Sequence, residues 1–211
     1  MRKAVIALFL LAFIGILAAQ AAQDEAIQSL DNAKGLINQK NYVKAQDEIN
    51  YALSKLSELL SEELVKYIPD APDGFRQDSK NAQGLGQMGG IMGSANAIAA
   101  KGDYTGTTAT GDDSQPSVHI TISVGGMMGK MASLAAMGQM YGGGSGTNSK
   151  SIRVAGYAGT MEYSTEDKNG KLSLQVGDKV SVVIEGDNLA NGDVLKTFAG
   201  KIDLAKLEKA F

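Results

Sequence analysis

The sequence predicts an α+β protein in which an N-terminal antiparallel helical hairpin is followed by an antiparallel β-sheet covered by one or two helices. Two patterns lead to this fold class. Apolar residues recur with helical spacing between residues 24 and 67, a stretch without proline. From residue 97 onward, several short segments alternate apolar and polar residues and are separated by glycine-containing turns, which is typical of half-buried strands in consecutive hairpins.

The first 21 residues have the pattern of a secretory signal peptide. Arg2 and Lys3 are followed by an apolar run over residues 4–19, and the triplet Ala19-Gln20-Ala21 has small residues at both ends. The run is shorter than the roughly 20 residues that span a bilayer. We therefore expect residues 1–21 to be a signal peptide, and the protein to be exported to a bacterial periplasm or to the outside of the cell. An uncleaved N-terminal anchor is the alternative.

Residues 22–68 are expected to form the helical hairpin. Apolar residues of its first half are Ile27, Leu30, Ala33, Leu36 and Ile37. After a break at residues 38–41, a spacing of four and three residues predicts one apolar seam along a second helix, formed by Ala45, Ile49, Ala52, Leu56 and Leu59. Residues 33–52 resemble a single tetratricopeptide-type unit. Because such arrays need about three units, we expect a two-helix module that packs on the rest of the protein or on a second copy.

The motif Pro69-Asp70-Ala71-Pro72-Asp73-Gly74-Phe75 ends the hairpin, because two prolines and a glycine favour an extended linker and a turn. With this motif the chain resembles a family of uncharacterised exported bacterial proteins. In that family a helical N-terminal region, a Pro-x-x-Pro-x-Gly-aromatic linker and an α+β domain follow one another. The family usually has Trp at the aromatic position, where this chain has Phe75. The resemblance implies that residues 69–211, which contain Gly/Met-rich segments, form an α+β domain similar to the PsbP-like fold. It implies no catalytic residues.

Residues 84–89 match a nucleotide-binding fingerprint. The segment Gly84-Leu85-Gly86-Gln87-Met88-Gly89 fits G-x-G-x-x-G, which in dinucleotide-binding folds directly follows a buried strand. Because the preceding residues, 77–81, are polar, we expect no strand there. We interpret the glycine-rich stretch of residues 82–102 as a flexible connection, and we expect no cofactor.

The sheet is expected to begin with a strand within residues 97–108. The next strand, residues 117–124, alternates most clearly: Val118, Ile120, Ile122 and Val124 fall on one face, and His119 falls on the other. Residues 151–154 and 157–163 predict two further strands. Asn169-Gly170 predicts a hairpin turn, and the strands of residues 172–176 and 180–184 follow with the turn Gly177-Asp178 between them. Val194, Leu195 and Phe198 predict a short helix closed by Gly200, and Asp203 is expected to cap a final helical turn.

The composition excludes several kinds of chemistry. The chain has no Cys and one His, which excludes disulfides, thiol chemistry, Cys-ligated metals and multi-His metal sites. Its 20 basic and 23 acidic residues give a formal net charge of −3, so we expect no nucleic-acid partner. The acidic residues Asp112-Asp113, Glu166-Asp167 and Asp187 lack the oxygen spacing of a calcium loop and are expected to form solvated turns.

The segment of residues 125–141 is the most unusual part of the sequence and is predicted to be helical. Its apolar residues include Met127, Met128, Met131, Leu134, Met137 and Met140. A helix that is apolar nearly all round is commonly buried in a core. Alternatively it forms an adaptable partner surface, with Met127, Met128, Met131 and Leu134 as contact residues. A third interpretation is a Cu(I) site, with thioether ligands from Met128, Met131, Met137 and Met140 beside His119.

These observations favour a non-enzymatic exported envelope protein that binds an unknown protein partner, or a second copy of itself, through an apolar Gly/Met-rich surface. Peripheral contact with a membrane is compatible with the same surface. The alternative function is a periplasmic Cu(I)-binding protein. A hydrolase would require His119 as its base, and the sequence does not identify a nucleophile for it.

Overall fold

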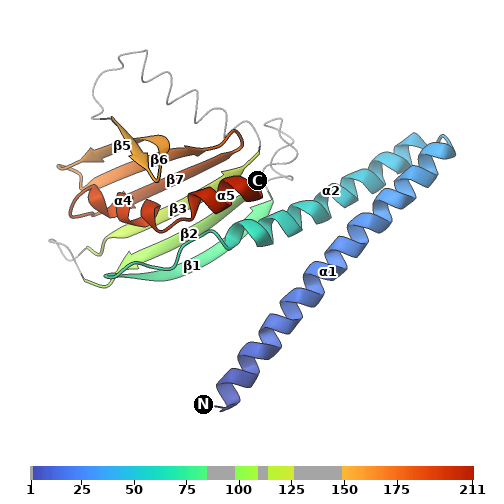
Figure 1. Ribbon diagram of the computed structural model, residues 1–211, viewed down its shortest axis with the longest axis horizontal. Helices are drawn as coiled ribbons and strands as arrows, with labels where there is room; N and C mark the ends of the chain where they lie inside the picture. The colour runs from blue at the N-terminus through green and yellow to red at the C-terminus, as the bar shows by residue number, and fades with distance from the viewer. Residues whose placement is uncertain (1, 85–97, 109–113, 126–148) are drawn as a thin grey trace. The chain divides into compact units, whose positions relative to one another are not determined.

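The computed structural model describes the backbone of residues 2–84, 98–108, 114–125 and 149–211, and the side chains of these residues except 2–19 and 83–84. The chain divides into two compact units, Met1–Leu60 and Ser61–Phe211 (Figure 1). The boundary lies within a helix, earlier in the chain than the boundary after residue 68 that the sequence suggests.

The first unit is the helical hairpin. It consists of α1 (Arg2–Asn38) and the greater part of α2 (Tyr42–Val65), with a tight turn between them in which Lys40 has a φ of 60°. The predicted hairpin is therefore confirmed. α1 includes the residues predicted to be a signal peptide, and their removal stays a prediction.

Among the residues whose side chains the structure describes, which exclude residues 2–19, no helix combines the length and the apolar character that crossing a membrane requires.

The second unit contains a seven-stranded, wholly antiparallel sheet with the strand order β1-β2-β3-β7-β6-β5-β4. The strands are β1 (Phe75–Gly84), β2 (Ile98–Gly106), β3 (Ser117–Val124), β4 (Lys150–Val154), β5 (Tyr157–Ser164), β6 (Asn169–Val176) and β7 (Val180–Asp187). Two consecutive meanders, β1 to β3 and β4 to β7, join where β7 pairs with β3. The predicted α+β class, and the strands predicted between residues 97 and 184, are confirmed.

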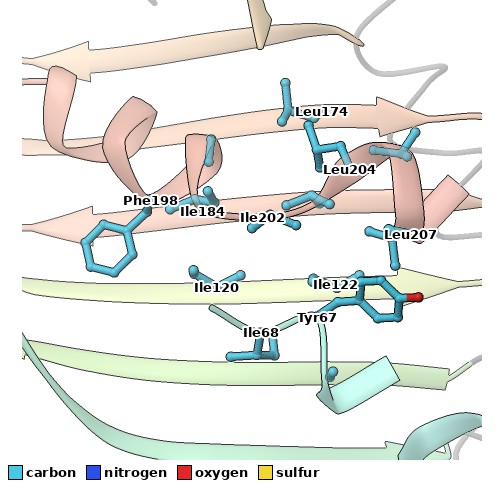
Figure 2. Packing of buried hydrophobic residues seen from close by; sticks show 14 of the residues in the cluster. Tyr67, Ile68, Ile120, Ile122, Leu174, Ile184, Phe198, Ile202, Leu204 and Leu207 are labelled. Atoms are coloured by element: carbon cyan, nitrogen blue, oxygen red, sulfur yellow. The ribbon is translucent and has the colours of Figure 1, made fainter. Parts of the chain in front are cut away.

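Two short helices cover one face of the sheet, α4 (Asp193–Gly200) and α5 (Leu204–Ala210) (Figure 1). Phe198 of α4 packs against Tyr104 and Phe75, with ring centroids 4.8 and 5.1 Å away. The carboxylate of Asp203 accepts a hydrogen bond from the backbone N–H of Lys206, which confirms the predicted cap. Figure 2 shows how the side chains of both helices meet those of the central strands in the core.

One prediction about the sheet is wrong: residues 77–81 belong to strand β1. β1 is an edge strand, and an edge strand needs fewer apolar residues because it is only partly buried. Its polar side chains have partners nearby. Gln77 donates to the Pro69 carbonyl, Lys80 donates to the Ile68 carbonyl, and Ser79 donates to Asp103. Polarity was therefore an insufficient reason to exclude a strand here.

The position of one turn also differs from the prediction. Asn169 and Gly170 pair with Ser164 and Tyr163 as the first residues of β6, and the turn consists of residues 165–168. Lys168, with a φ of 53°, supplies the left-handed residue of this turn. Gly170 is required for packing, since a Cβ there would lie 2.9 Å from the Glu162 carbonyl oxygen and 3.0 Å from a Leu195 methyl group.

The proline linker is fixed to the sheet through a buried tyrosine. The Tyr104 hydroxyl donates a 2.6 Å hydrogen bond to the Pro69 carbonyl, and Gln77 donates a 3.2 Å bond to the same hydroxyl. Burial raises the pKa of Tyr104 to about 12, so the phenol keeps the proton that it donates. Beside it, Gly102 leaves the space that Ile68 fills, because a Cβ there would lie 2.5 Å from the Ile68 methyl group.

We predict that Tyr104→Phe lowers the free energy of unfolding by about 1–2 kcal/mol, because it removes a buried hydrogen bond. The measurement is denaturant unfolding of the purified protein. Tyr157→Phe is the matched control, since the Tyr157 hydroxyl donates to Glu208 on the exposed surface and its loss is expected to lower the stability less than the loss of the Tyr104 hydroxyl. Equal losses in the two variants would contradict the role given to Tyr104.

Candidate functional site

The face of the sheet opposite the helices carries a row of polar side chains. Strand registers place Asp103, His119, Glu185 and Lys171 side by side across β2, β3, β7 and β6, and Glu162 of β5 continues the row. The row follows from the two-residue period of a strand, which directs neighbouring apolar residues to the opposite face. The predicted position of His119 on the polar face is confirmed, and half of its side chain is exposed.

His119 is held by a carboxylate. Its Nδ1 lies 2.7 Å from Oδ1 of Asp103, and the Ser79 hydroxyl donates to Oδ2 of the same carboxylate. The hydrogen bond from Ser79, followed by the one to His119, lowers the pKa of Asp103. Asp103 therefore remains ionised at neutral pH and orients the imidazole.

The order of these three groups is Ser–Asp–His. Activation of a serine nucleophile requires Ser–His–Asp, in which the imidazole accepts the proton of the hydroxyl group. Here the Ser79 hydroxyl is bonded to the Asp103 carboxylate instead. The arrangement fits a structural hydrogen-bond network across three strands better than a hydrolytic centre.

His119 lies at one side of an open depression of about 750 Å³, next to the β5–β6 turn. Its acidic lining residues outnumber its basic ones: Glu162, Glu166, Asp167, Glu185 and Asp187 surround it, and Lys171 is bonded to Glu185 at 2.8 Å. Among the described residues, no group of three or more His, Asp or Glu side chains is arranged to hold a metal ion. The depression is thus an acidic, solvated surface.

The methionine-rich segment lies outside the described residues. This applies to the predicted partner surface, Met127, Met128, Met131 and Leu134, and to the predicted thioether ligands Met128, Met131, Met137 and Met140. It also applies to Asp112-Asp113 and to residues 85–89 of the glycine fingerprint. A strand, β1, does precede that fingerprint, but it is an antiparallel edge strand, whereas dinucleotide-binding loops follow a buried parallel strand.

A second candidate surface lies on the helical hairpin. The two helices contact each other through small residues, since Ala26, Ser29 and Ala33 of α1 and Ala45 and Ala52 of α2 are buried. The prediction that all five residues of the α2 seam face α1 is therefore wrong in part. Ala45 and Ala52 belong to it, but Ile49 and Leu56 are 37% and 40% exposed. The residues that the neighbouring helix covers most completely are thus small ones.

The large apolar residues are turned to one side of the hairpin. Ile27, Leu30 and Leu53 directly follow the buried Ala26, Ser29 and Ala52 and so lie about 100° further round their helices, and the other large apolar residues continue the same stripes at spacings of three, four or seven residues. Because the helices run in opposite directions and face each other, this rotation carries the residues of both helices to the same side. We call this surface the apolar hairpin face; its eight residues are Ile27, Leu30, Ile37, Tyr42, Ile49, Leu53, Leu56 and Leu60, with exposures from 36% to 63%.

The other side of the hairpin is polar. Glu25 and Tyr51 directly precede the buried Ala26 and Ala52, and the Tyr51 hydroxyl donates a 2.8 Å hydrogen bond to Glu25. Lys55 lies 3.1 Å from the same carboxylate. The hydrogen bond from Tyr51, followed by the one from Lys55, lowers the pKa of Glu25. Residues that precede the contact in both helices thus meet on one side, which supports the placement of the apolar residues on the opposite side.

Sequence analysis missed the apolar hairpin face, although a signal for it is present. In α2, Tyr42, Ile49, Leu53, Leu56 and Leu60 recur at spacings of seven, four, three and four residues, which is itself a heptad-like stripe. Ala45 and Ala52 follow a second stripe next to it. Hydrophobicity does not distinguish which of two adjacent apolar stripes is buried against the neighbouring helix.

Comparisons with protein-family models, curated proteins and solved structures found no significant match to this chain.

We predict that Ser79→Ala raises the pKa of Asp103 towards the ordinary value of about 3.9, because it removes the main hydrogen bond to the carboxylate. The measurement is an NMR titration of the side-chain carboxyl group. Ser164→Ala is the control, since the Ser164 hydroxyl donates to Asp167, and it is expected to leave the titration of Asp103 unchanged.

The same substitution has an expected effect on stability. A lowered folded-state pKa means that ionised Asp103 stabilises the fold above about pH 4, and that this contribution is lost as the pH falls through the folded-state pKa. The wild type should therefore exceed Ser79→Ala in stability at pH 7, by less than about 1 kcal/mol at this exposed position, and the pH-dependent part of the difference should shrink below pH 4. A difference that grows on acidification would contradict the assignment.

Proposed function

We propose that the protein is a non-enzymatic, exported protein of the bacterial envelope that acts by binding a protein partner, or a second copy of itself, through exposed apolar surface. The observation that carries the proposal is the apolar hairpin face. Monomeric soluble proteins rarely expose contiguous apolar patches beyond a few hundred Å². Eight large apolar side chains on one side of two helices form the kind of surface that a partner covers.

The polar face of the sheet supports the non-enzymatic part of the proposal. Its imidazole is bonded to a carboxylate that also binds the serine hydroxyl. Its depression is open, whereas enzyme pockets bury most of a small substrate.

The Gly/Met-rich segment, with Met127, Met128, Met131 and Leu134, is proposed as a further apolar contact of the same protein.

The proposed location rests on the leader pattern. Arg2, Lys3, the apolar run of residues 4–19 and the Ala19-Gln20-Ala21 triplet together match the signals that direct secretion. Export of a protein without Cys requires no oxidative folding step.

We predict that the protein recovered from the envelope or medium of an expressing bacterium lacks residues 1–21, because a signal peptidase cleaves after the small-x-small triplet. Intact-mass spectrometry measures the N-terminus directly. Replacing Ala19 and Ala21 by Leu should retain the leader. A full-length mass for the unaltered protein would contradict the proposed processing.

The binding proposal is tested by position-specific photo-cross-linking in intact cells. Benzoylphenylalanine in place of Ile49 is expected to give a cross-linked species, because that side chain is covered in the complex. The same residue in place of Asn32, on the polar side of the hairpin, is the matched control and should give none. Equal adducts at both positions, or none at position 49, would contradict binding through the apolar hairpin face.

A further inference from the structure

We propose that the apolar hairpin face binds the same face of a second copy of this chain, so that two hairpins form a four-helix bundle. This inference rests on the proposed function and names its partner. It concerns a surface different from the methionine-rich segment.

The first argument is the arrangement of the face in layers. Each apolar residue of α1 has a counterpart in α2 that is separated from Lys40, in the turn, by nearly the same number of residues. The layers are Ile37 with Tyr42, Leu30 with Ile49 and Ile27 with Leu53, and Leu56 and Leu60 extend the series along α2. Lys34 and Gln46 form one polar layer within it. Paired layers across two antiparallel helices are the repeating unit of a four-helix bundle core.

The second argument is the shape of the face. It is two helices wide, since both helices contribute apolar residues that are between 36% and 63% exposed. A single amphipathic helix lying on it would cover a central strip, whereas a second hairpin covers its full width. Because the two surfaces are identical, contact through a two-fold axis satisfies both copies at once.

The third argument is area. Eight large apolar side chains that are about half exposed would hide several hundred Å² per copy. Together with their flanking residues they approach the roughly 800 Å² per partner that a stable interface buries. The core of such an interface is depleted in charged residues, and the one charged side chain at a layer position, Lys34, has a long apolar stem that lets its amine reach the rim.

The experiment measures the oligomeric state of the protein recovered from the exported fraction, by sedimentation equilibrium up to about 100 μM. The unaltered protein is expected to have twice the mass of the chain. Leu30→Glu and Leu53→Glu each place two carboxylates per dimer in the apolar core and are expected to raise the dimer Kd by at least about 100-fold. Glu maintains the helices because its helix propensity is high.

Val43→Glu is the matched control. Val43 is 74% exposed and lies outside the apolar hairpin face, so the dimer Kd should change less than about threefold. Circular dichroism and the unfolding midpoint show whether each variant remains folded.

Chemical cross-linking gives a second measurement that does not depend on a destabilising substitution. The chain has no native Cys, so Ile49→Cys and Asn32→Cys each introduce a single thiol. A bismaleimide with a hexane spacer is expected to link two copies of Ile49→Cys and to leave Asn32→Cys as single chains.

A monomer at about 100 μM, or a dimer that Leu30→Glu and Leu53→Glu leave intact, would overturn this inference. If the protein is monomeric and the benzophenone at position 49 nevertheless cross-links to a different protein, the second copy is excluded and the proposed binding function stands. If position 49 gives no adduct of either kind, both proposals fail.

Discussion

The pairing of β3 with β7 is the constraint on which the second unit depends. Eight residues of each strand are in register, and this ladder joins two meanders that are separate in the chain. Its core-facing pairs, Ile120 with Ile184 and Ile122 with Val182, are fully buried. Without this contact each meander would expose an apolar strand edge, which is unfavourable in water. The helices α4 and α5 complete the core over the same strands (Figure 2).

The same register determines which side chains lie on the exposed polar face of the sheet. Because side chains alternate between the faces of a strand, burying Ile120 and Ile184 brings their neighbours His119 and Glu185 together on the polar face. Asp103 and Lys171 then provide partners for these two groups. The carboxylates of the row, Asp103, Glu185 and Glu162, outnumber its one lysine, Lys171, so this face is acidic.

The helical hairpin follows a different packing rule. A sheet and its covering helices can enclose large side chains between two layers, but a pair of helices has a single narrow contact. In this protein alanine occupies much of that contact. The larger residues, among them Leu30 and Ile49, remain on one side. They would need a further layer to become buried, which is the physical basis for proposing that this unit binds a partner.

Periodicity was sufficient to identify the elements whose environment is the same along their length. β3 alternates along all eight residues because one of its faces is buried throughout, and Asp203 caps α5 through a contact that spans three residues. These are local relations, so the fold class, most strands and the position of His119 could be predicted. The single turn between two helical periodicities was likewise enough to predict a hairpin.

Tertiary structure alone decided the features that depend on distant residues. Residues 77–81 become a strand because β2 and the proline linker supply partners for polar side chains. Asn169 and Gly170 lie in β6 because the register with β5 shifts the turn to the preceding residues. The buried stripe of α2 is the alanine stripe because α1 presents Ala26 and Ala33 to it. In each case the local pattern permits two arrangements, and the free energy of a contact made elsewhere in the chain selects one of them.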